Sequence, residues 1–430
     1  MTRILVHGAH VNGESIDGTG SSFHSLRDRL GQAGAGSGDI VVLSGLQGRD
    51  LVLATMAVWQ LNAVPMPVPE PGPDGQDARP LFDACQVSPD LSVLPAAPGH
   101  QANRLDTTAV LHLSSGSTDR PKVVRRGVSS VLQDAEGYRT GLGLAPGDRV
   151  AVPVPLVHSF GWGIAISALL SGCDIDVTPF VRASTPARKA DSGAVSVLAL
   201  TPPVARLMIQ TRRQGEFLPR AAMAGAGPVS DELGKAFQER FGVPLLRGYG
   251  STETGGTFFG DQGMGRPVPG VDIVEPLPGG RGELVLRLAA PVEGYLSDDQ
   301  EPRREWRTGD IVRHGTDGCM HFEQRVRGPL RLNGRFIRAN ITEQVLRSVP
   351  GTTDVFLLVL PRSDSPEIED FYAVVEGSAS KDDLLAALSK GPAQNPIPQV
   401  VVCDRLPRTT VGKRDRDALI ETVRKVSTCD

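Results

Sequence analysis

A glycine- and hydroxyl-rich loop that ends in a lysine is the part of this chain best suited to chemistry. It follows an apolar run, residues 108–112, that predicts a short buried strand. The loop contains Ser114, Ser115, Gly116, Ser117 and Thr118, and Lys122 closes it. Small residues leave backbone N–H groups accessible, so hydroxyls, amides and an ammonium together suit the oxygens of a polyphosphate. Read alone, the same composition also fits a polar surface turn, because short motifs recur by chance.

Four further segments carry side chains that could complete a nucleotide site. They are residues 248–253 with Tyr249, Gly250, Thr252 and Glu253, residues 306–310 ending in Asp310 on a predicted turn, Arg325, and residues 407–416 with Lys413. Each alone also fits an ordinary turn, helix start, linker or basic surface. Only seven of the 45 basic residues are lysines, so lysines inside motifs are less easily explained by chance. Neither the P-loop signature nor a strand-borne dinucleotide fingerprint occurs.

Alternating strands and helices must position these segments. Residues 39–69 predict strand, helix and strand, and further strand–helix units begin near residues 149, 196 and 220. This order favours an α/β fold, with a large layered N-terminal domain of mixed or parallel sheets covered by helices. Short strands and turns are expected from residue 282 to 320. An α+β pattern follows residue 328, so we expect domains at 1–325 and 326–430.

Composition narrows the class of protein. The chain has 430 residues and a net charge of −4 without a basic block, so nucleic acid is not an expected partner. Its five cysteines lack metal-ligand spacing and predict reduced thiols. No apolar run approaches the length of a membrane span. We therefore expect a soluble cytoplasmic protein without membrane insertion.

Taken together and in order, the motifs resemble the adenylate-forming (ANL) superfamily. That family includes acyl- and aryl-CoA ligases and the adenylation domains of nonribosomal peptide synthesis. Its signatures S-G-S-T-G-x-P-K, Y-G-x-T-E, Y-R-T-G-D and P-x-T-x-x-G-K-x-x-R correspond to residues 115–122, 249–253, 306–310 and 407–416. Residues 282–287 with Gly294 and Tyr295 are similar to the family's G-E-[IL]-x-x-R and G-Y elements.

The resemblance implies two half-reactions at one site. A carboxylate attacks the α-phosphate of ATP and releases pyrophosphate, and an acceptor then displaces AMP. Attack of one anion on another needs charge neutralisation, which Lys413 and a Mg²⁺ at Glu253 would supply. A small mobile C-terminal domain carrying Lys413 would rotate between the half-reactions.

The resemblance also assigns binding roles. Thr252 would donate to the α-phosphate, Tyr249 beside Gly250 would stack on adenine, Asp310 with Arg325 would bind the ribose, and residues 114–122 would hold the β- and γ-phosphates. Gly225, Ala226 and Gly227 resemble the family stretch that lines adenine and acyl substrate, although a plain strand-to-helix turn is an equal alternative.

The expected acid pocket includes His158, Phe160, Trp162 and Gly163, in a P-L-x-H-x-x-G pattern similar to acyl- and aryl-acid ligases. Amino-acid-activating domains have an aspartate here to pair the α-ammonium, and a buried ammonium without one would be costly. A small carboxylic acid without an α-amino group is therefore expected, aryl or short to medium acyl. His158 is either a gate or a hydrogen-bonded structural histidine.

Three functions are compatible with these residues. The first passes the acyl group to the phosphopantetheine thiol of CoA or of an acyl carrier protein, and the second passes it to an amine. The third is a non-catalytic protein that binds nucleotide or acyl-adenylate. The sequence departs from the family pattern at Asp119, where glycine is usual, at Arg327, which replaces the hinge acid, and at Arg338, where a glutamate is expected. The last two changes bear on the transfer step.

Overall fold

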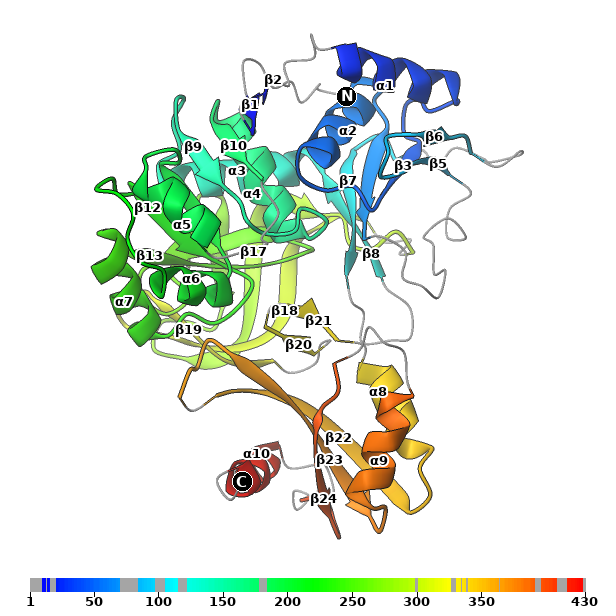
Figure 1. Ribbon diagram of the computed structural model, residues 1–430, viewed down its shortest axis with the longest axis vertical. Helices are drawn as coiled ribbons and strands as arrows, with labels where there is room; N and C mark the ends of the chain where they lie inside the picture. Colours follow the sequence, from blue (N-terminus) through cyan, green and yellow to red (C-terminus); the bar gives the residue numbers. More distant parts are fainter. Residues whose placement is uncertain are drawn as a thin grey trace. The chain divides into compact units, whose positions relative to one another are not determined.

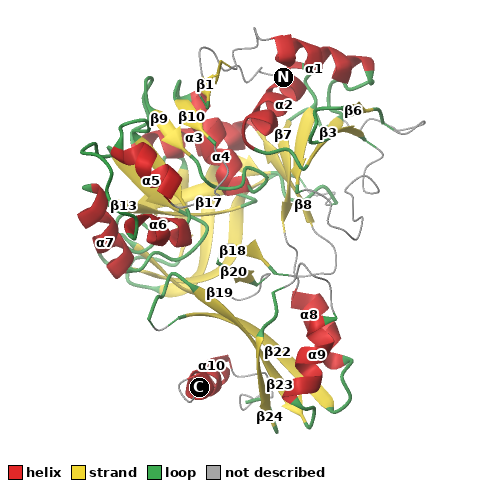
Figure 2. Ribbon diagram, in the orientation of Figure 1, coloured by secondary structure: helices red, strands yellow, loops and turns green. Residues whose placement is uncertain are grey.

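The computed structural model describes residues 10–12, 14–15, 21–69, 84–96, 105–114, 122–177, 184–297, 301–325, 330–333, 335–337, 339–362, 364–390, 396–407 and 416–427. The chain separates into two compact units, a large one that ends at Val326 and a small one that begins at Arg327. The fold is mixed α/β, as the alternation of strands and helices predicts (Figures 1 and 2).

A long, mostly parallel sheet forms one half of the large unit. Its order is β15-β14-β13-β12-β11-β9-β10-β1-β2, with parallel pairing from β13 through to β1. The strands are β1 His10–Val11, β2 Glu14–Ser15, β9 Arg149–Ala151, β10 Asp174–Asp176, β11 Val197–Leu200, β12 Ala221–Ala224, β13 Leu245–Ser251, β14 Gly255–Gly260 and β15 Arg266–Pro267. The strands predicted near residues 149, 196 and 220 are therefore confirmed, because short apolar runs lie centrally in a parallel sheet.

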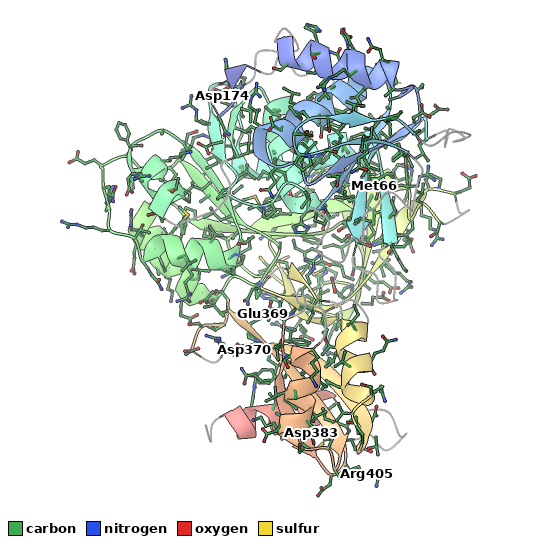
Figure 3. All side chains as sticks on the ribbon, turned by 45° about the vertical axis from the view of Figure 1, so that its right-hand side comes forward. Met66, Asp174, Glu369, Asp370, Asp383 and Arg405 are labelled. Atoms are coloured by element: carbon green, nitrogen blue, oxygen red, sulfur yellow. The ribbon has the colours of Figure 1, made fainter. Side chains whose placement is uncertain are left out.

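A second layered region contains the predicted strand–helix–strand unit. Strands β4, β3, β5 and β6 form one sheet in that order, and β7 and β8 form an antiparallel hairpin. Their bounds are β3 Ile40–Ser44, β4 Val64–Val68, β5 Cys85–Val87, β6 Val93–Leu94, β7 Thr108–Ser114 and β8 Lys122–Gly127. Met66 of β4 is fully buried in a cluster with side chains of β3 and β7 (Figure 3).

Helices cover these sheets. In the large unit they are α1 Ser21–Gln32, α2 Gly48–Gln60, α3 Val128–Leu142, α4 Ser159–Leu170, α5 Ser184–Asp191, α6 Pro202–Ile209 and α7 Asp231–Phe241. Local signals explain their ends: Ser230 caps α7 by accepting from the Leu233 N–H at 3.1 Å, and Gly242 ends it with a φ of 74°. Helix α4 is apolar on nearly all sides and lies within the main core.

The region from residue 282 to 320 differs from its prediction. Short strands and turns were expected, but two 12-residue strands, β17 Arg281–Val292 and β18 Arg303–His314, pair antiparallel between β16 Val271–Glu275 and β19 Met320–Arg325. Asp310 consequently lies inside β18 and not on a turn. Glycines and polar residues here are accommodated by register shifts and by Gly309 with a φ of 73°, so turn-like signals occur within continuous strands.

The small unit has its own core. Its elements are β20 Arg331–Leu332, β21 Arg335–Phe336, α8 Ala339–Arg347, β22 Thr352–Pro361, β23 Glu369–Gly377, α9 Lys381–Ser389, β24 Gln399–Cys403 and α10 Arg416–Ser427. Strands β22, β23 and β24 form a sheet with apolar clusters on both faces. Glu369 and Asp370 lie at the start of β23 (Figure 3), where Glu369 accepts from the Asn333 N–H at 2.7 Å. The α+β pattern expected here is confirmed.

Candidate active site

The hairpin β7–β8 holds both ends of the hydroxyl-rich loop. Ser114 ends β7 and pairs directly with Lys122, the first residue of β8. The Ser114 hydroxyl also donates to the Lys122 carbonyl at 3.4 Å. Residues 115–121, which include Ser115, Gly116, Ser117, Thr118 and Asp119, lie outside the described residues. The residues at the two ends of the loop are therefore paired with each other on adjacent antiparallel strands.

Tyr295 connects Lys122 with Glu253. The Lys122 ammonium lies 4.7 Å from the centre of the Tyr295 ring, and the Tyr295 hydroxyl donates to Glu253 Oε1 at 2.9 Å. A bridge between Val124 and Tyr295 fixes this arrangement to β8. A cation over an aromatic face is stabilised by the ring quadrupole. The structure thus brings the expected phosphate lysine to the ring face of Tyr295 and the expected metal carboxylate to its hydroxyl.

The chemistry of this carboxylate fits a hard divalent cation. Mg²⁺ is usually held by one or two protein carboxylates together with phosphate oxygens and water. Glu253 is half-buried, and its Oε1 already accepts from Tyr295. Among the described residues no group of three or more His, Cys, Asp and Glu is arranged to hold a metal ion. Glu253 could therefore hold a cation that takes its remaining ligands from a nucleotide.

Thr252 is buried in the turn between β13 and β14, where its side chain meets the start of α4. The hydroxyl of Ser159, the first residue of that helix, donates to Thr252 Oγ1 at 3.3 Å. His158 is the N-cap of α4, and its carbonyl accepts from the Trp162 N–H at 3.0 Å. The candidate catalytic threonine and the candidate gate histidine are therefore linked through one helix terminus.

Tyr249 and Asp310 form a direct hydrogen bond. The Tyr249 hydroxyl, on β13, donates to Asp310 Oδ2 at 2.5 Å across to β18. Asp310 is 4% exposed, and Arg325 is its cross-strand neighbour on β19, although the Arg325 side chain lies outside the described part. The Tyr249 ring packs edge-on against Phe258 at 5.8 Å. The expected adenine and ribose residues therefore lie together.

Two glycines permit close approaches around this site. A Cβ on Gly250 would overlap the Gly255 carbonyl oxygen, so the two ends of the hairpin turn are in contact. A Cβ on Gly225 would lie 2.8 Å from Cε2 of Phe160, so the Phe160 ring packs directly over Gly225. Ala226 adopts a φ of 62°, which is unusual for a residue other than glycine. Gly227 contacts Pro202 more loosely.

Comparison with known proteins now bears on this arrangement. A family model described as AMP-binding enzyme matches residues 74–296, just over half of the chain. The chain belongs to the AMP-binding enzyme family. The resemblance to the adenylate-forming superfamily predicted from the motifs is thereby confirmed.

The relatives of this chain match different shares of its length. Isonitrile lipopeptide synthase of Streptomyces coeruleorubidus is 28% identical over 92% of this chain, which spans only 31% of that protein's length. The 2-succinylbenzoate–CoA ligase of Staphylococcus aureus is 25% identical over 73% of this chain and 67% of its own. The structure is similar to that of the amide bond synthetase McbA from Marinactinospora thermotolerans, with a TM-score of 0.78 and 18% identity. The match covers 96% of this chain and 97% of McbA. This last likeness shows the fold alone.

Trp162 and Gly163 of α4 face the interior of the protein. The Trp162 indole is 4% exposed and packs edge-on against Trp59 and His112, with ring centres 5.7 and 5.2 Å apart. A Cβ on Gly163 would lie 3.0 Å from Asp134 Oδ2. These two residues of α4 therefore pack against Trp59, His112 and Asp134 in the interior, whereas Phe160 packs on Gly225.

His112 ends the run, residues 108–112, that the sequence predicts as a short buried strand. It is 1% exposed on β7, and neither of its ring nitrogens has a hydrogen-bond partner among the described residues. Burial lowers the pKa of His112 to about 3, and the nearby charges of Arg126 and His158 act in the same direction. The imidazole is therefore neutral at physiological pH. The apolar run predicts this burial, but it does not predict that the ring nitrogens lack partners among the described residues.

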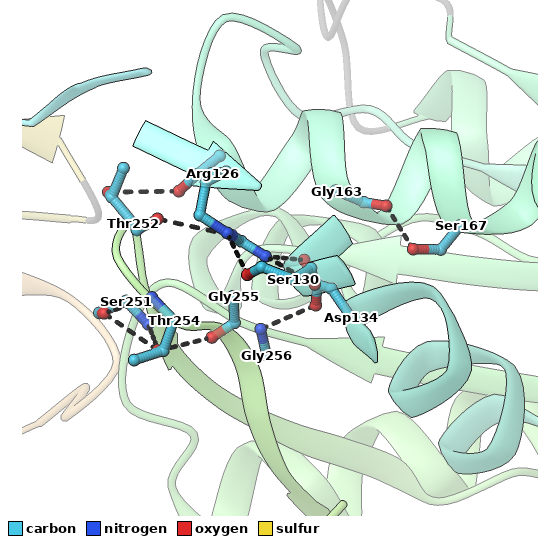
Figure 4. Close-up of polar contacts among 11 residues, drawn as sticks. Arg126, Ser130, Asp134, Gly163, Ser167, Ser251, Thr252, Thr254, Gly255 and Gly256 are labelled. Carbon is cyan, nitrogen blue, oxygen red and sulfur yellow. Dashed lines mark hydrogen bonds and ion pairs between the residues drawn. The ribbon is translucent and has the colours of Figure 1, made fainter. Parts of the chain in front are cut away.

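A buried ion pair was also missed. Arg126 on β8 and Asp134 on α3 approach to 3.4 Å, with side chains 3% and 5% exposed. Figure 4 shows this pair between the helix and the turn that carries Thr252. An acidic and a basic residue eight positions apart are common on protein surfaces, so their spacing alone does not distinguish a buried pair.

Lys413 lies outside the described residues, so its position stays a prediction.

Proposed function

We propose that this protein catalyses ATP-dependent activation of a carboxylic acid without an α-amino group, forming an acyl-adenylate and pyrophosphate. A carboxylate oxygen of the acid attacks the α-phosphorus, and the bond from that phosphorus to the pyrophosphate oxygen breaks. The observation that carries the proposal is the link from Lys122 through Tyr295 to Glu253. In this link the Lys122 ammonium and the Glu253 carboxylate contact one tyrosine, and Glu253 directly follows Thr252 in the turn.

The remaining residues would bind and orient the nucleotide. Tyr249 would contact adenine, Asp310 would accept hydrogen bonds from the ribose, and Lys122 would neutralise the departing phosphates. A bound Mg²⁺ would add charge neutralisation at the phosphates. Lys413, from the small unit, would contribute a positive charge at the reacting oxygen. We assign nucleotide and acid binding to residues 1–325 and this lysine to residues 326–430.

We further propose that the acyl group passes to a phosphopantetheine thiol of CoA or a carrier protein. The thiol sulfur would attack the acyl carbonyl carbon, the bond to AMP would break, and the thiol proton would be released. The name of the Staphylococcus aureus relative, a CoA ligase, supports this acceptor. An amine acceptor is the second candidate, because Arg327 and Arg338 depart from the family pattern at the predicted hinge and transfer segments.

Carboxylate-dependent ATP–pyrophosphate exchange tests the first half-reaction without knowledge of the acceptor. A panel of aryl, fatty and α-amino acids should give exchange with one class that lacks the α-amino group. Strong exchange with an α-amino acid would contradict the substrate class, and silence across the panel despite ATP binding would favour a non-catalytic protein. Mass analysis of reactions supplied in parallel with CoA, pantetheine and simple amines would then distinguish thioester from amide.

A further inference from the structure

The turn between β13 and β14 is held at both ends by one ion pair. Arg126 Nη1 donates to the carbonyl oxygen of Thr252 at 3.4 Å, and Asp134 Oδ1 accepts from the Gly256 N–H at 2.8 Å (Figure 4). Thr252 opens the turn, and Gly256 belongs to the strand that follows it. Glu253 is the next residue after Thr252, so its backbone lies within the clamped segment.

The guanidinium of Arg126 is held by hydrogen bonds to helix α3. Arg126 Nε donates to the Ser130 hydroxyl at 2.9 Å, and Nη2 donates to the Ser130 carbonyl at 3.3 Å and to Asp134 Oδ2 at 3.4 Å. Ser130 and Asp134 lie four residues apart, on one face of α3. The guanidinium fork is therefore anchored on one side by α3 and contacts the turn on the other.

The turn backbone packs directly against these charges. Gly255 has a φ of 74°, and a Cβ on it would lie 2.6 Å from Arg126 Nη2 and 2.7 Å from Asp134 Cγ. On the opposite side, a Cβ on Gly163 of α4 would lie 3.0 Å from Asp134 Oδ2. Ser159 at the start of α4 contacts the Thr252 hydroxyl. Asp134 thus packs against both α4 and the turn, and Ser159 links the helix to the turn directly.

Stability alone is a poor explanation for such a pair. Removing two charges from water costs several kcal/mol per ion, so well-packed apolar residues of similar volume often stabilise a core equally or better. A buried pair with specific contacts to backbone groups is better explained by the geometry that it imposes. Small displacements of reacting groups, about 1 Å, can lower rates by roughly 100-fold.

We propose that Arg126 and Asp134 form a positioning pair that sets Thr252 and Glu253 for Mg²⁺·ATP. Both side chains are buried and contact the turn, so the pair acts through the turn. This inference rests on the proposed adenylation function, because it assigns the turn a role at the phosphates.

Arg126→Lys and Asp134→Asn test the inference. Lysine keeps the charge but lacks the fork that reaches both Ser130 and Thr252, and asparagine keeps the shape and an acceptor for Gly256 without the charge. We expect both to lower kcat of exchange by about 10- to 100-fold with little change in KM for the acid. We also expect the Mg²⁺-dependent increase in ATP affinity, measured by calorimetry, to fall about tenfold.

Arg240 and Asp191 provide the matched control. They form another ion pair in the large unit, with Asp191 buried and Arg240 partly exposed, and their guanidinium-to-carboxylate distances are 2.8 and 2.9 Å. Arg240→Lys should lower the unfolding midpoint but leave kcat and the Mg²⁺ effect on ATP affinity unchanged at a temperature where the variant is folded. The same pattern in Arg126→Lys and Asp134→Asn would overturn the positioning role.

A further variant and the behaviour of the wild-type protein complete the test. Where Arg126→Lys does not fold, Ser130→Ala removes one anchor of the guanidinium and should give a smaller change in the same direction. A wild-type protein that binds Mg²⁺·ATP but shows no exchange would overturn the proposed function, and the calorimetric comparison would still decide on positioning. A wild type that neither binds nor exchanges would overturn both proposals.

Discussion

The hydroxyl of Tyr295 donates to Glu253 Oε1 at 2.9 Å, and the same ring lies beneath the ammonium of Lys122. One side chain therefore makes two separable contacts: a hydrogen bond that orients the carboxylate and a cation–π contact that positions the lysine. Substitutions at residue 295 can remove one contact or both.

Tyr295→Phe should raise the Mg²⁺ concentration for half-maximal exchange several-fold. A hydrogen bond to a charged group contributes about 1.5–3 kcal/mol, and its loss leaves Glu253 less well oriented. Tyr295→Leu, which also removes the ring below Lys122, should additionally raise KM for ATP. A Mg²⁺ titration of exchange separates the two variants. Equal behaviour of Tyr295→Phe and wild type would argue against a metal role for Glu253.

Asp310→Asn should raise KM for ATP by about 10- to 100-fold, because the ribose hydroxyls lose a charged acceptor. The penalty should largely disappear with 2′,3′-dideoxy-ATP, which weakens wild-type binding to a similar level. Exchange kinetics with the two nucleotides complete the cycle. A penalty of the same size with both nucleotides would indicate that Asp310 acts elsewhere, for instance only through its bond to Tyr249.

Gly225→Ala should change the choice of acid without changing KM for ATP. Its Cβ would lie 2.8 Å from Phe160 Cε2, so the ring must move away from the strand. We expect bulky acids to lose kcat/KM by about tenfold relative to small ones, since one carbon in an apolar pocket is commonly worth this much. The double variant Gly225→Ala with Phe160→Leu relieves the contact, and it should recover bulky acids. Uniform loss for every acid would place the ring outside the acid pocket.

His112 should make the fold sensitive to mild acid. Its pKa in the folded protein is about 3, below the ordinary value of 6.5, so between these limits the unfolded chain binds up to one more proton at this residue. Its contribution to stability is therefore fully present above pH 6.5 and falls by about 1.4 kcal/mol per pH unit below it.

His112→Phe keeps an aromatic ring beside Trp162 but cannot titrate. The free energy of unfolding, measured in urea at pH 7, 6 and 5, should therefore decline less steeply in this variant than in wild type. Parallel slopes would show that His112 accepts its proton at a similar pH in both states. The comparison uses slopes, so any constant cost of repacking cancels.

Lys413→Ala should abolish most exchange while leaving ATP binding within a few-fold of wild type. The residue is assigned to the transition state and not to the ground-state nucleotide. Lys425→Ala, a change at the other lysine near the end of the chain, serves as the control and should exchange normally. Retained exchange in Lys413→Ala would show that another cation neutralises the reacting oxygen.

Local patterns predicted much of the fold. Apolar runs bounded by glycine and proline placed β3, α2, β4 and the later strand–helix units, because buried parallel strands leave a continuous apolar signal. The same reasoning misread β17 and β18. Bulges let a strand continue through glycine and charged residues, and a pattern of residue types carries no register information.

For the candidate site, the sequence predicted candidate residues but not the contacts between them. The motifs singled out Tyr249, Thr252, Glu253 and Asp310 as candidates. The structure pairs Tyr249 with Asp310, and it links Glu253 to Lys122 through Tyr295. The contacts between them were not predictable, since Tyr295 and Glu253 lie 42 residues apart and Asp134 and Gly256 lie 122 apart. The burial of Arg126, and the lack of partners for the His112 ring among the described residues, depend on such long-range packing, which the order of residues along one strand does not reveal.

Helix α4 gives this enzyme a built-in constraint on redesign. Ser159 contacts the Thr252 hydroxyl, and Phe160, the next residue, packs on Gly225. On the proposed function, a change that tilts the helix to admit a larger acid would also displace the turn that we assign to the nucleotide. On the proposed function, laboratory evolution toward new acids should therefore proceed first through side-chain exchange at Phe160 and Gly225, and variants that shift the helix should need a second, compensating substitution to recover their turnover.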